Sequence, residues 1–518
     1  MIKGRILWID DEIELLKSHI MYLEKKDYSV FSVSSGEDGI ETFKNNNFDI
    51  ILLDEMMTGL DGLSTLKKIK NINPSIPIIM ITKNEEEWLM EEAIASQISN
   101  YLTKPVNPSQ ILIACKNVLE HQKIQSENTL KDYLNDFEDL GVRIEKAKDH
   151  FDWYEIANFL SEWTLKFDDI SDISLKEMFN QQKFSANKLF SDFYINNYLR
   201  WLNEREDRPV LSNDVLNEFI RPKLIDDEKV IFVVIDCLRL DQWKEISNYL
   251  YPYFNVKNSC HFSIIPSATP YSRNAIFSGL FPIQIQQYYP EKWAEMEYDE
   301  TSMNRFEREF IINYLKRNNL ESKSLKYSKI ITYEEGKKIA NNINNFKNID
   351  LFCLVVNFVD ILGHLRSESN LIKEIIPDED GYRKIVSNWF ENSWLFQILK
   401  EIKSWGHKIV ITSDHGSLRV NRPIKIKGDR STSTGIRYKH GRNLNVNSKY
   451  GLKIDNPSEY FLPSSTNSTS YLIAKEDLFF LYVNNYNKFV KKLKHSFQHG
   501  GVSIDEIIVP VGELVGKD

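Results

Sequence analysis

The sequence predicts an α/β protein with more than one domain, and three observations support this. Short apolar runs alternate with helical patterns over residues 1–121 and again over 209–518, which is typical of parallel sheets flanked by helices. The stretch between them, 122–208, shows only helical periodicity. The chain of 518 residues also exceeds what one hydrophobic core usually supports. We therefore predict three domains with these boundaries.

The composition indicates a globular protein of a reducing compartment. Hydrophobic residues make up 42% of the chain, and its 4 cysteines form no CxxC pair, which argues against a disulfide framework or cysteine-ligated zinc. No apolar run approaches the ~20 residues of a membrane span, and the N-terminus lacks a secretory pattern. We expect a cytoplasmic protein without membrane insertion. The net charge of −9 argues against coating of duplex DNA by bulk electrostatics.

In the first segment, polar residues follow the apolar runs RILWI, DIILL, IPIIMI and SNYL. They are Asp10 and Asp11 after the first run, Asp54 after the second, Thr82 after the third and Lys104 near the fourth. The carboxyl ends of parallel strands meet at one edge of a sheet, where ligands bind. Three carboxylates there suit a magnesium ion, and a lysine would neutralise a phosphoryl group.

These positions resemble those of a response-regulator receiver domain, which has a flavodoxin-like fold. The resemblance implies a phospho-acceptor, Asp54, a magnesium site of Asp10, Asp11 and Asp54, and a switch formed by Thr82, Tyr101 and Lys104. In the pattern DEMMTGLDG, Thr58 stands where the family usually has proline. This departure affects the stiffness of the loop and not the chemistry.

Residues 122–208 are predicted to form a helical bundle. Leu130, Leu134, Phe137 and Leu140 are spaced three or four apart, and only Gly141 interrupts a stretch otherwise free of glycine and proline. A bundle that follows a receiver is a natural place for dimerisation, although no heptad pattern runs long enough to assert a coiled coil.

The last segment carries potential metal ligands near the ends of its apolar runs: Asp236, Asp360, His364, Asp414, His415 and His499. Taken singly, each has a structural explanation, because an aspartate at a strand end usually caps a helix and a His-Gly pair usually lies in a turn. Together the six are enough for two metal ions, which could clamp the attacking and leaving oxygens of a phosphoryl displacement. Aspartate and histidine suit zinc, and manganese suits sites richer in carboxylates.

The candidate nucleophile is Thr269 in IPSATPYSRNAIFSGLFP, which leaves a strand and enters a helix expected to begin near Ser272. Unpaired backbone N–H groups at a helix start favour an anionic phosphate. A threonine hydroxyl needs a metal ion or a base before it can attack at neutral pH.

The order and spacing of these segments resemble the alkaline phosphatase superfamily, and the ending HGGVSIDEIIVPV resembles its PglZ branch. The resemblance implies one metal site of Asp236, Asp414 and His415, a second of Asp360, His364 and His499, and Thr269 as the bridge between them. Ser272 falls where phosphodiesterase relatives place an asparagine that contacts the phosphoryl oxygens.

Residues 419–449 are strongly basic, with a single acid, Asp429. The basic side chains are Arg419, Arg422, Lys425, Lys427, Arg430, Arg437, Lys439, Arg442 and Lys449. This stretch could steer a substrate with several phosphates into the site, or it could be a solvated loop. If it steers, a nucleotide or oligonucleotide phosphodiester is favoured over a small monoester. Candidate substrate contacts are Arg437, His440 and Arg442, together with Ser272.

A receiver, a helical bundle and a PglZ domain in this order resemble the PorX-type response regulators of type IX secretion. The resemblance implies a sensor histidine kinase, an extracytoplasmic-function sigma factor and the cytoplasmic part of the secretion motor as partners, and a homodimer after phosphorylation. Two hypotheses remain: a phosphodiesterase controlled by the receiver, or a signalling scaffold whose metal site is structural or vestigial. The intact Thr269 favours the enzyme, since a structural site needs no nucleophile.

Overall fold

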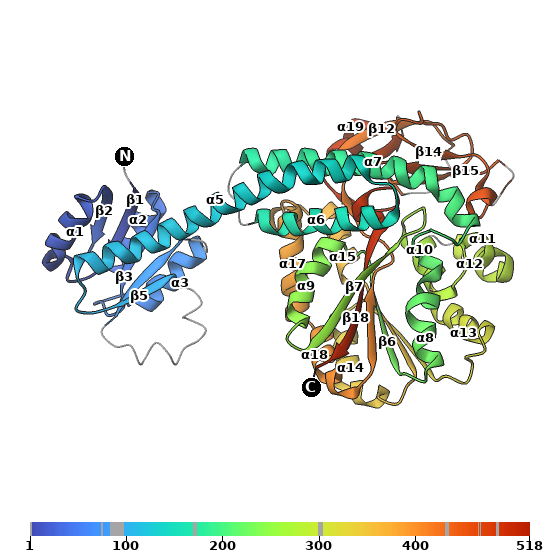
Figure 1. Ribbon diagram of the computed structural model, residues 1–518, viewed down its shortest axis with the longest axis horizontal. Helices are drawn as coiled ribbons and strands as arrows, with labels where there is room; N and C mark the ends of the chain where they lie inside the picture. The colour runs from blue at the N-terminus through green and yellow to red at the C-terminus, as the bar shows by residue number, and fades with distance from the viewer. Residues whose placement is uncertain are drawn as a thin grey trace. The chain divides into compact units, whose positions relative to one another are not determined.

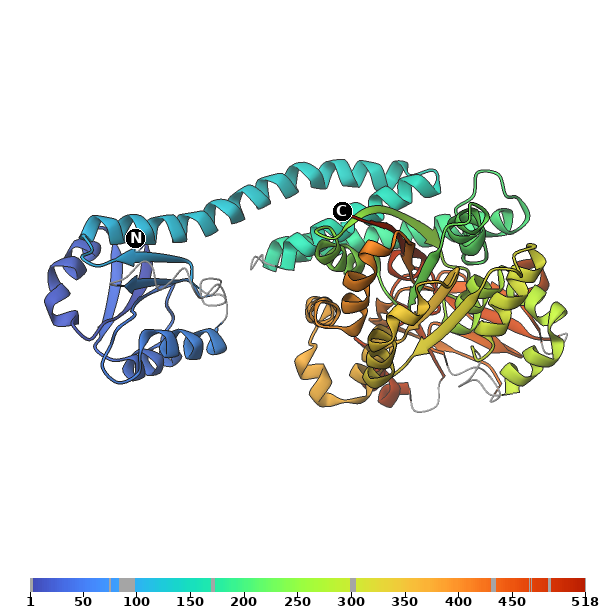
Figure 2. The same cartoon turned by 90° about the horizontal axis from the view of Figure 1, so that it is seen from below.

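The computed structural model describes residues 3–73, 76–82, 98–168, 173–298, 304–429, 435–464, 466, 468–482 and 486–517. The chain forms two compact units, Met1–Phe137 and Glu138–Asp518 (Figure 1). It passes from one to the other within a single helix, α5 (Pro108–Lys146), which is continuous in Figure 2. The domain boundary predicted after residue 121 therefore falls inside this helix.

The first unit contains a parallel sheet of five strands in the order β2-β1-β3-β4-β5. Its elements are β1 (Gly4–Ile9), η1 (Ile13–Leu16), α1 (Lys17–Glu24), β2 (Tyr28–Val33), α2 (Gly36–Asn45), β3 (Ile50–Asp54), α3 (Gly62–Ile72), β4 (Ile78–Thr82), β5 (Asn100–Thr103) and the start of α5. Buried side chains cover both faces of the sheet, with Trp8 and Leu52 on one side and Leu7 and Leu53 on the other. This strand order confirms the predicted flavodoxin-like fold.

Helices α6 (His150–Asp168) and α7 (Ile173–Asn203) confirm the helical character of the middle segment. They do not stand apart, because α7 packs on the strands that follow. The hydroxyl of Tyr194 donates to the carbonyl of Ser263 at 2.7 Å, and the hydroxyl of Ser191 donates to the carbonyl of Val502 at 2.8 Å. An aromatic cluster that includes Phe190 and Phe262 buries the same face.

The main sheet of the second unit has six strands in the order β7-β18-β10-β6-β9-β8. They are β6 (Val230–Ile235), β7 (Phe254–Phe262), β8 (Leu325–Ile330), β9 (Leu351–Val356), β10 (Lys408–Thr412) and β18 (Ile508–Gly516). β10, β6, β9 and β8 run parallel, whereas β18 is antiparallel to both its neighbours. The predicted alternation of strands and helices is present, and the antiparallel strand β18 lies between β7 and β10.

Helices flank this sheet on both faces (Figure 1). They are η3 (Ser212–Asp214), the π-helix η4 (Leu216–Ile220), α8 (Arg221–Ile225), α9 (Leu240–Leu250), α10 (Thr269–Ser278), α11 (Pro282–Tyr288), α12 (Pro290–Tyr298), α13 (Glu307–Arg317), α14 (Tyr333–Asn341), η6 (Ile343–Phe346), α15 (Phe358–Glu368), α16 (Asn370–Ile375), α17 (Glu379–Glu391), α18 (Trp394–Ile402), η7 (Lys403–Trp405) and α20 (Ile504–Ile507).

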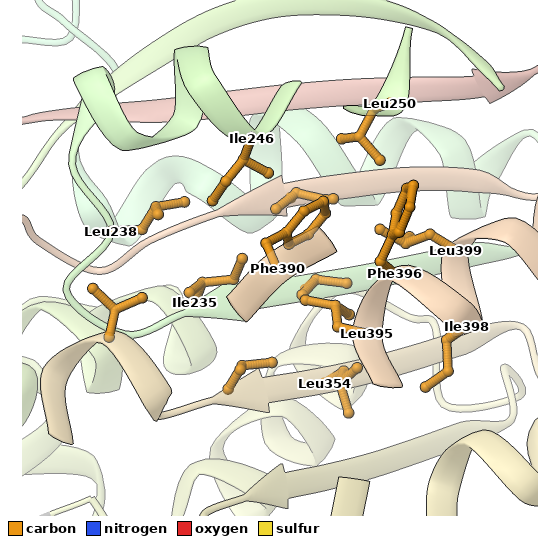
Figure 3. Close-up of a cluster of buried hydrophobic side chains, with 14 of the residues drawn as sticks. Ile235, Leu238, Ile246, Leu250, Leu354, Phe390, Leu395, Phe396, Ile398 and Leu399 are labelled. Atoms are coloured by element: carbon orange, nitrogen blue, oxygen red, sulfur yellow. The ribbon is translucent and has the colours of Figure 1, made fainter. Parts of the chain in front are cut away.

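Because side chains alternate along a strand, β6 supplies both faces of the core. Ile235 packs in the same buried cluster as residues of α9, α17 and α18, and Figure 3 shows this cluster with Leu354, Phe390 and Leu399. On the opposite face, Phe232 packs with α10 and α13. Both clusters are fully buried, so the carboxyl ends of β6, β9 and β10 are held rigidly.

A small β-rich insertion lies between β10 and β18, which the predicted α/β alternation did not anticipate. Its elements are β11 (Leu418–Arg419), β12 (Arg422–Ile426), β13 (Tyr438–Gly441), β14 (Gly451–Ile454), η8 (Pro457–Tyr460), β15 (Ser470–Ala474), β16 (Leu478–Tyr482), α19 (Tyr486–Leu493) and β17 (Phe497–Gln498). β11 pairs with β17, β12 with β16, and β15 lies between β13 and β14.

Among the helices in the described part of the chain, none combines the length and apolar character needed to cross a membrane.

The core of the second unit yields a stability prediction. Leu399→Ala should lower the free energy of unfolding by about 2–5 kcal/mol, because Leu399 is completely buried and its loss leaves a cavity. Leu371→Ala is the matched control, since that side chain is 65% exposed and its loss should change the free energy by less than about 0.5 kcal/mol. Denaturant unfolding followed by tryptophan fluorescence measures both, and equal destabilisation would contradict the assigned core.

Candidate phospho-acceptor site and metal centre

In the first unit, the predicted acidic residues meet at the carboxyl edge of the sheet. Asp10 and Asp11 follow β1 and Asp54 ends β3, and oxygens of the three carboxylates lie within 4.8 Å of one another. Lys104 reaches them from beyond β5, with its Nζ 2.9 Å from Asp54 Oδ2 and 3.4 Å from Asp10 Oδ2. The backbone N–H of Thr58 donates to Asp11 at 3.0 Å.

Burial raises the pKa of Asp54 to about 6, although the hydrogen bond from Lys104 opposes the shift. The neighbouring carboxylates of Asp10 and Asp11 add to the rise. A hard divalent cation would neutralise these three charges, and an all-oxygen set of this kind fits magnesium.

The two other predicted switch residues lie on the neighbouring strands. The hydroxyl of Thr82, at the end of β4, is buried and donates to the carboxylate of Glu55. Tyr101 is on β5, and its side chain is 49% exposed. β4, which ends at Thr82, is therefore the neighbour in the sheet of β3, which ends at Asp54.

In the second unit, the six predicted ligands come from four places in the fold. They are Asp236 after β6, Asp360 and His364 one turn apart in α15, Asp414 and His415 after β10, and His499 after β17. They form two groups, in each of which the ligand atoms lie within 4.8 Å of one another: Asp236, Asp414 and His415, and Asp360, His364 and His499. These groups are the two that the family resemblance implied.

The two groups are adjacent. The rings of His415 and His499 stack with centroids 4.3 Å apart, which joins one group to the other. His499 Nε2 and His364 Nε2 lie 3.6 Å and 3.4 Å from the same oxygen of Asp360. In the first group, His415 Nε2 is 3.6 Å from Asp414 Oδ2.

The residues present fit a pair of metal ions. Within the described residues, Asp414 Oδ2 and His499 Nδ1 are buried without a hydrogen-bond partner, and such atoms call for an explanation such as an ion. Burial raises the pKa of Asp236 to about 7 and also raises the pKa of Asp414. Bound cations would stabilise the charged forms of these two carboxylates and so offset the effect of burial. Carboxylate and imidazole donors suit zinc, and also manganese.

Thr269 is the first residue of α10 and lies against the first group. Its Oγ1 is 3.0 Å from His415 Nε2 and donates to Asp236 Oδ1 at 3.4 Å. The helix starts at Thr269, not near Ser272, because Ala268 is still extended and Pro270 suits the first turn. Thr269 is only partly buried, whereas Asp236, Asp414 and His415 of the first group are buried.

Arg273 was missed by the sequence prediction. It lies one turn beyond Thr269 in α10, is completely buried, and donates from Nη1 to Asp236 Oδ2 at 2.6 Å. Its Nε donates to Glu307 at 2.5 Å, and Glu307 also accepts from the hydroxyl of Tyr327. A single charged residue in the otherwise uncharged segment TPYSRNAIFS was the available signal.

Two predicted substrate contacts are closed to any ligand. Ser272 is buried, and its hydroxyl donates to Ala268 within the helix at 2.9 Å. Arg437 is also completely buried. Its guanidinium forms an ion pair with Glu506 and donates to the carbonyl of Leu478, so its charge is already compensated. We therefore withdraw both from the substrate contacts.

The rest of the basic stretch is not one surface. His440 stacks on the ring of Tyr471 at 5.4 Å, whereas Arg442 is exposed. Arg422 pairs with Glu476 and Asp477, and Lys439 is buried. Arg430 lies outside the described residues.

Family models match three consecutive parts of the chain. The response regulator receiver domain matches residues 6–116, the PorX response regulator linker domain 123–202, and the BREX system PglZ alkaline phosphatase-like domain 215–514. The chain is thus a response regulator with an alkaline phosphatase-like output domain. Because the PglZ match covers more than half of the chain, the chain belongs to the PglZ family, in the arrangement of the PorX-type response regulators.

Curated relatives match a smaller part. ResD of Bacillus subtilis, a transcriptional regulatory protein, is 32% identical over 115 residues, which are 22% of this chain and 48% of that protein. SrrA of Staphylococcus aureus, another such regulator, is 30% identical over 135 residues, or 25% of this chain and 56% of that protein. The chain spans about half the length of these curated relatives.

Among solved structures, a response regulator receiver domain protein from Clostridium thermocellum is 30% identical, with a TM-score of 0.22. The match covers 23% of this chain and 98% of that one. A receiver domain implies phosphorylation by a sensor kinase, and an alkaline phosphatase-like domain makes the chain a candidate hydrolase of that superfamily.

Arg273→Met tests the buried network. Removal of the guanidinium leaves Asp236 and Glu307 without their counter-charge, which should cost about 3–5 kcal/mol of stability. Zinc or manganese would restore positive charge beside Asp236, so added metal should raise the melting temperature of the variant more than that of the wild type. Arg308→Met, at an exposed position of α13, is the control. Equal metal-induced shifts in Arg273→Met and wild type would contradict this role.

Proposed function

We propose that the chain is a response regulator whose PglZ domain is a two-metal phosphodiesterase controlled by phosphorylation of Asp54. The observation that carries the enzymatic part is the position of Thr269. Its hydroxyl lies 3.0 Å from His415 and 3.4 Å from Asp236, beside a complete set of six donors. A site with only a structural role needs no hydroxyl at this point.

Asp236, Asp414 and His415 would hold one metal ion, and Asp360, His364 and His499 the other, both zinc or manganese. When bound, such ions lower the pKa of a coordinated hydroxyl and neutralise phosphoryl oxygens. Arg273 occupies Asp236 Oδ2, which leaves Oδ1 directed to Thr269.

Thr269 Oγ1 would attack the phosphorus of the diester. A bond from Oγ1 to phosphorus forms, the bond from phosphorus to one ester oxygen breaks, and one alcohol leaves. The proton of the Thr269 hydroxyl ends on the departing alcohol. Water then cleaves the bond from Oγ1 to phosphorus in the diester that joins Thr269 to the second alcohol, which returns a proton to Oγ1 and releases the phosphate monoester. α10 begins at Thr269, so the positive end of its helix dipole would lie beside the phosphate and favour its negative charge.

In the receiver unit, Asp54 would accept a phosphoryl group from a sensor histidine kinase. Asp10, Asp11 and Asp54 would hold the magnesium ion, and Lys104 would pair with the phosphoryl group. Thr82 and Tyr101 would carry the signal, and phosphorylated chains would form a homodimer. The PorX-type arrangement supports a role in type IX secretion, with a sigma factor and the cytoplasmic part of the secretion motor as partners. The scattered cysteines support a cytoplasmic location.

Hydrolysis of bis(p-nitrophenyl) phosphate and p-nitrophenyl phosphate by zinc- or manganese-loaded protein tests the enzymatic proposal. We expect the diester to be cleaved faster than the monoester, and Thr269→Ala to lower kcat for the diester by about 100-fold or more. Thr332→Ala, which removes the cap of α14, is the control. Full metal occupancy without hydrolysis of either ester would favour the alternative, a phosphorylation-switched signalling scaffold.

Acetyl phosphate with magnesium tests the phospho-acceptor. Light scattering should show that it converts wild-type monomers to dimers, and Asp54→Ala should remain monomeric because no acyl phosphate can form. A thermal melt of the variant checks that its fold is intact. Dimerisation of Asp54→Ala by acetyl phosphate would reject the assignment.

A further inference from the structure

Two segments of the insertion lie side by side next to the candidate metal centre. β11 begins three residues after His415, and β17 ends at the residue before His499. The two strands pair antiparallel, with Leu418 opposite Gln498. Beyond this short ribbon, one strand continues into β12 and the other is preceded by α19. Only a few residues of the chain therefore separate β12 from His415 and α19 from His499.

β12 and α19 contact each other, and their labels stand together in Figure 1. The hydroxyl of Tyr486, at the start of α19, donates to the carbonyl of Pro423 in β12 at 3.2 Å. Val490 and Leu493 pack with the buried cluster that contains Val420 and Leu481. The apolar face of α19 is therefore already covered by the protein.

The opposite face of α19 is basic. Lys488, Lys491 and Lys492 are exposed, and their spacing places them on one side of the helix. Lys425 in β12 and Lys427, the residue just after this strand, are also exposed, and Ile426 between them is buried. Lys425 lies over the ring of Tyr486 at 4.6 Å, which brings the two sets together. These five residues are the lysine surface.

Within the described residues, no carboxylate pairs with any of these five ammonium groups. An uncompensated cluster of five positive charges contrasts with the net charge of −9 of the whole chain. Phe489 adds an aromatic ring that is 42% exposed beside Lys488. Lysines that neutralise phosphates, next to an exposed ring on which a base can stack, are the elements of single-strand recognition.

We propose that the lysine surface binds the sugar-phosphate backbone of a single-stranded nucleic acid and that Phe489 stacks on one of its bases. The meaning of this binding rests on the proposed phosphodiesterase: the strand would be held with its scissile phosphate at Thr269. Lys492 is seven residues from His499, so the chain between them spans at most about 25 Å. An oligonucleotide of modest length can reach from one to the other.

A lipid surface fits these observations less well. A basic helix that binds a membrane inserts its apolar face among the lipids, but in α19 this face is packed against the insertion. Only Phe489 would remain for insertion.

The test uses full-length protein with Thr269→Ala, which cannot cut the probe, and a fluorescein-labelled single-stranded 12-mer. Anisotropy titrations over a series of salt concentrations should give a dissociation constant that rises with salt. Adding Lys488→Gln, Lys491→Gln and Lys492→Gln should weaken binding at least tenfold at low salt. It should also reduce the slope of log K against log salt by about 2, since each phosphate contact contributes about 0.7 for single strands.

The matched control removes three other exposed lysines, with Lys337→Gln, Lys338→Gln and Lys400→Gln on α14 and α18. It changes the net charge equally and should leave the salt slope unchanged. Phe489→Ala should weaken binding about fivefold or more without altering the slope. Equal weakening by the two lysine triples would overturn the proposal, and so would tighter binding to phosphatidylglycerol vesicles than to the 12-mer.

Kinetics separates this proposal from the proposed function. In protein with Thr269 intact, the α19 triple should raise KM for the oligonucleotide while kcat/KM for bis(p-nitrophenyl) phosphate stays unchanged. If neither ester nor oligonucleotide is cleaved but the binding results hold, the enzymatic proposal fails and the lysine surface stands. If both substrates are cleaved and the triple leaves KM unaltered, the lysine surface is refuted and the enzyme stands.

Discussion

The burial of carboxylates at the carboxyl ends of parallel strands is the constraint on which both units depend. Asp54 in the first unit and Asp236 and Asp414 in the second are almost completely buried, and burial raises the pKa of each. Such groups persist in a folded protein only with compensating positive charge. The sites are therefore places where a cation is strongly favoured.

The two units supply that charge differently. Lys104 has a side chain that is 18% exposed and pairs with both Asp54 and Asp10. Arg273 is completely buried and is held between Asp236 and Glu307. A buried ion pair of this kind adds little net stability, which favours a positioning role: Arg273 holds one oxygen of Asp236, and the other oxygen faces Thr269.

The insertion between β10 and β18 connects the centre with a wider surface. Its ribbon of β11 and β17 starts beside His415 and His499, and its outer part carries the lysine surface. The basic residues of this insertion are of two kinds. Arg437 forms an ion pair with Glu506, and Arg422 forms ion pairs with Glu476 and Asp477. These pairs stabilise the insertion, whereas the lysines of α19 are exposed.

The sequence by itself determined the α/β class, the acidic edge of the receiver, the six donors and the nucleophile candidate, because strand periodicity and the residues at strand ends are local properties. The tertiary structure alone decided which polar groups are buried and what they face. Arg437 meets Glu506, which is 69 residues away, and Arg273 meets Asp236 and Glu307, 37 and 34 residues away. Only the fold also shows that α7 packs on later segments of the second unit and that Lys425 lies next to α19. The burial and the ion pairing of a polar side chain depend on which distant segments of the chain pack against each other. The local sequence pattern does not contain this information.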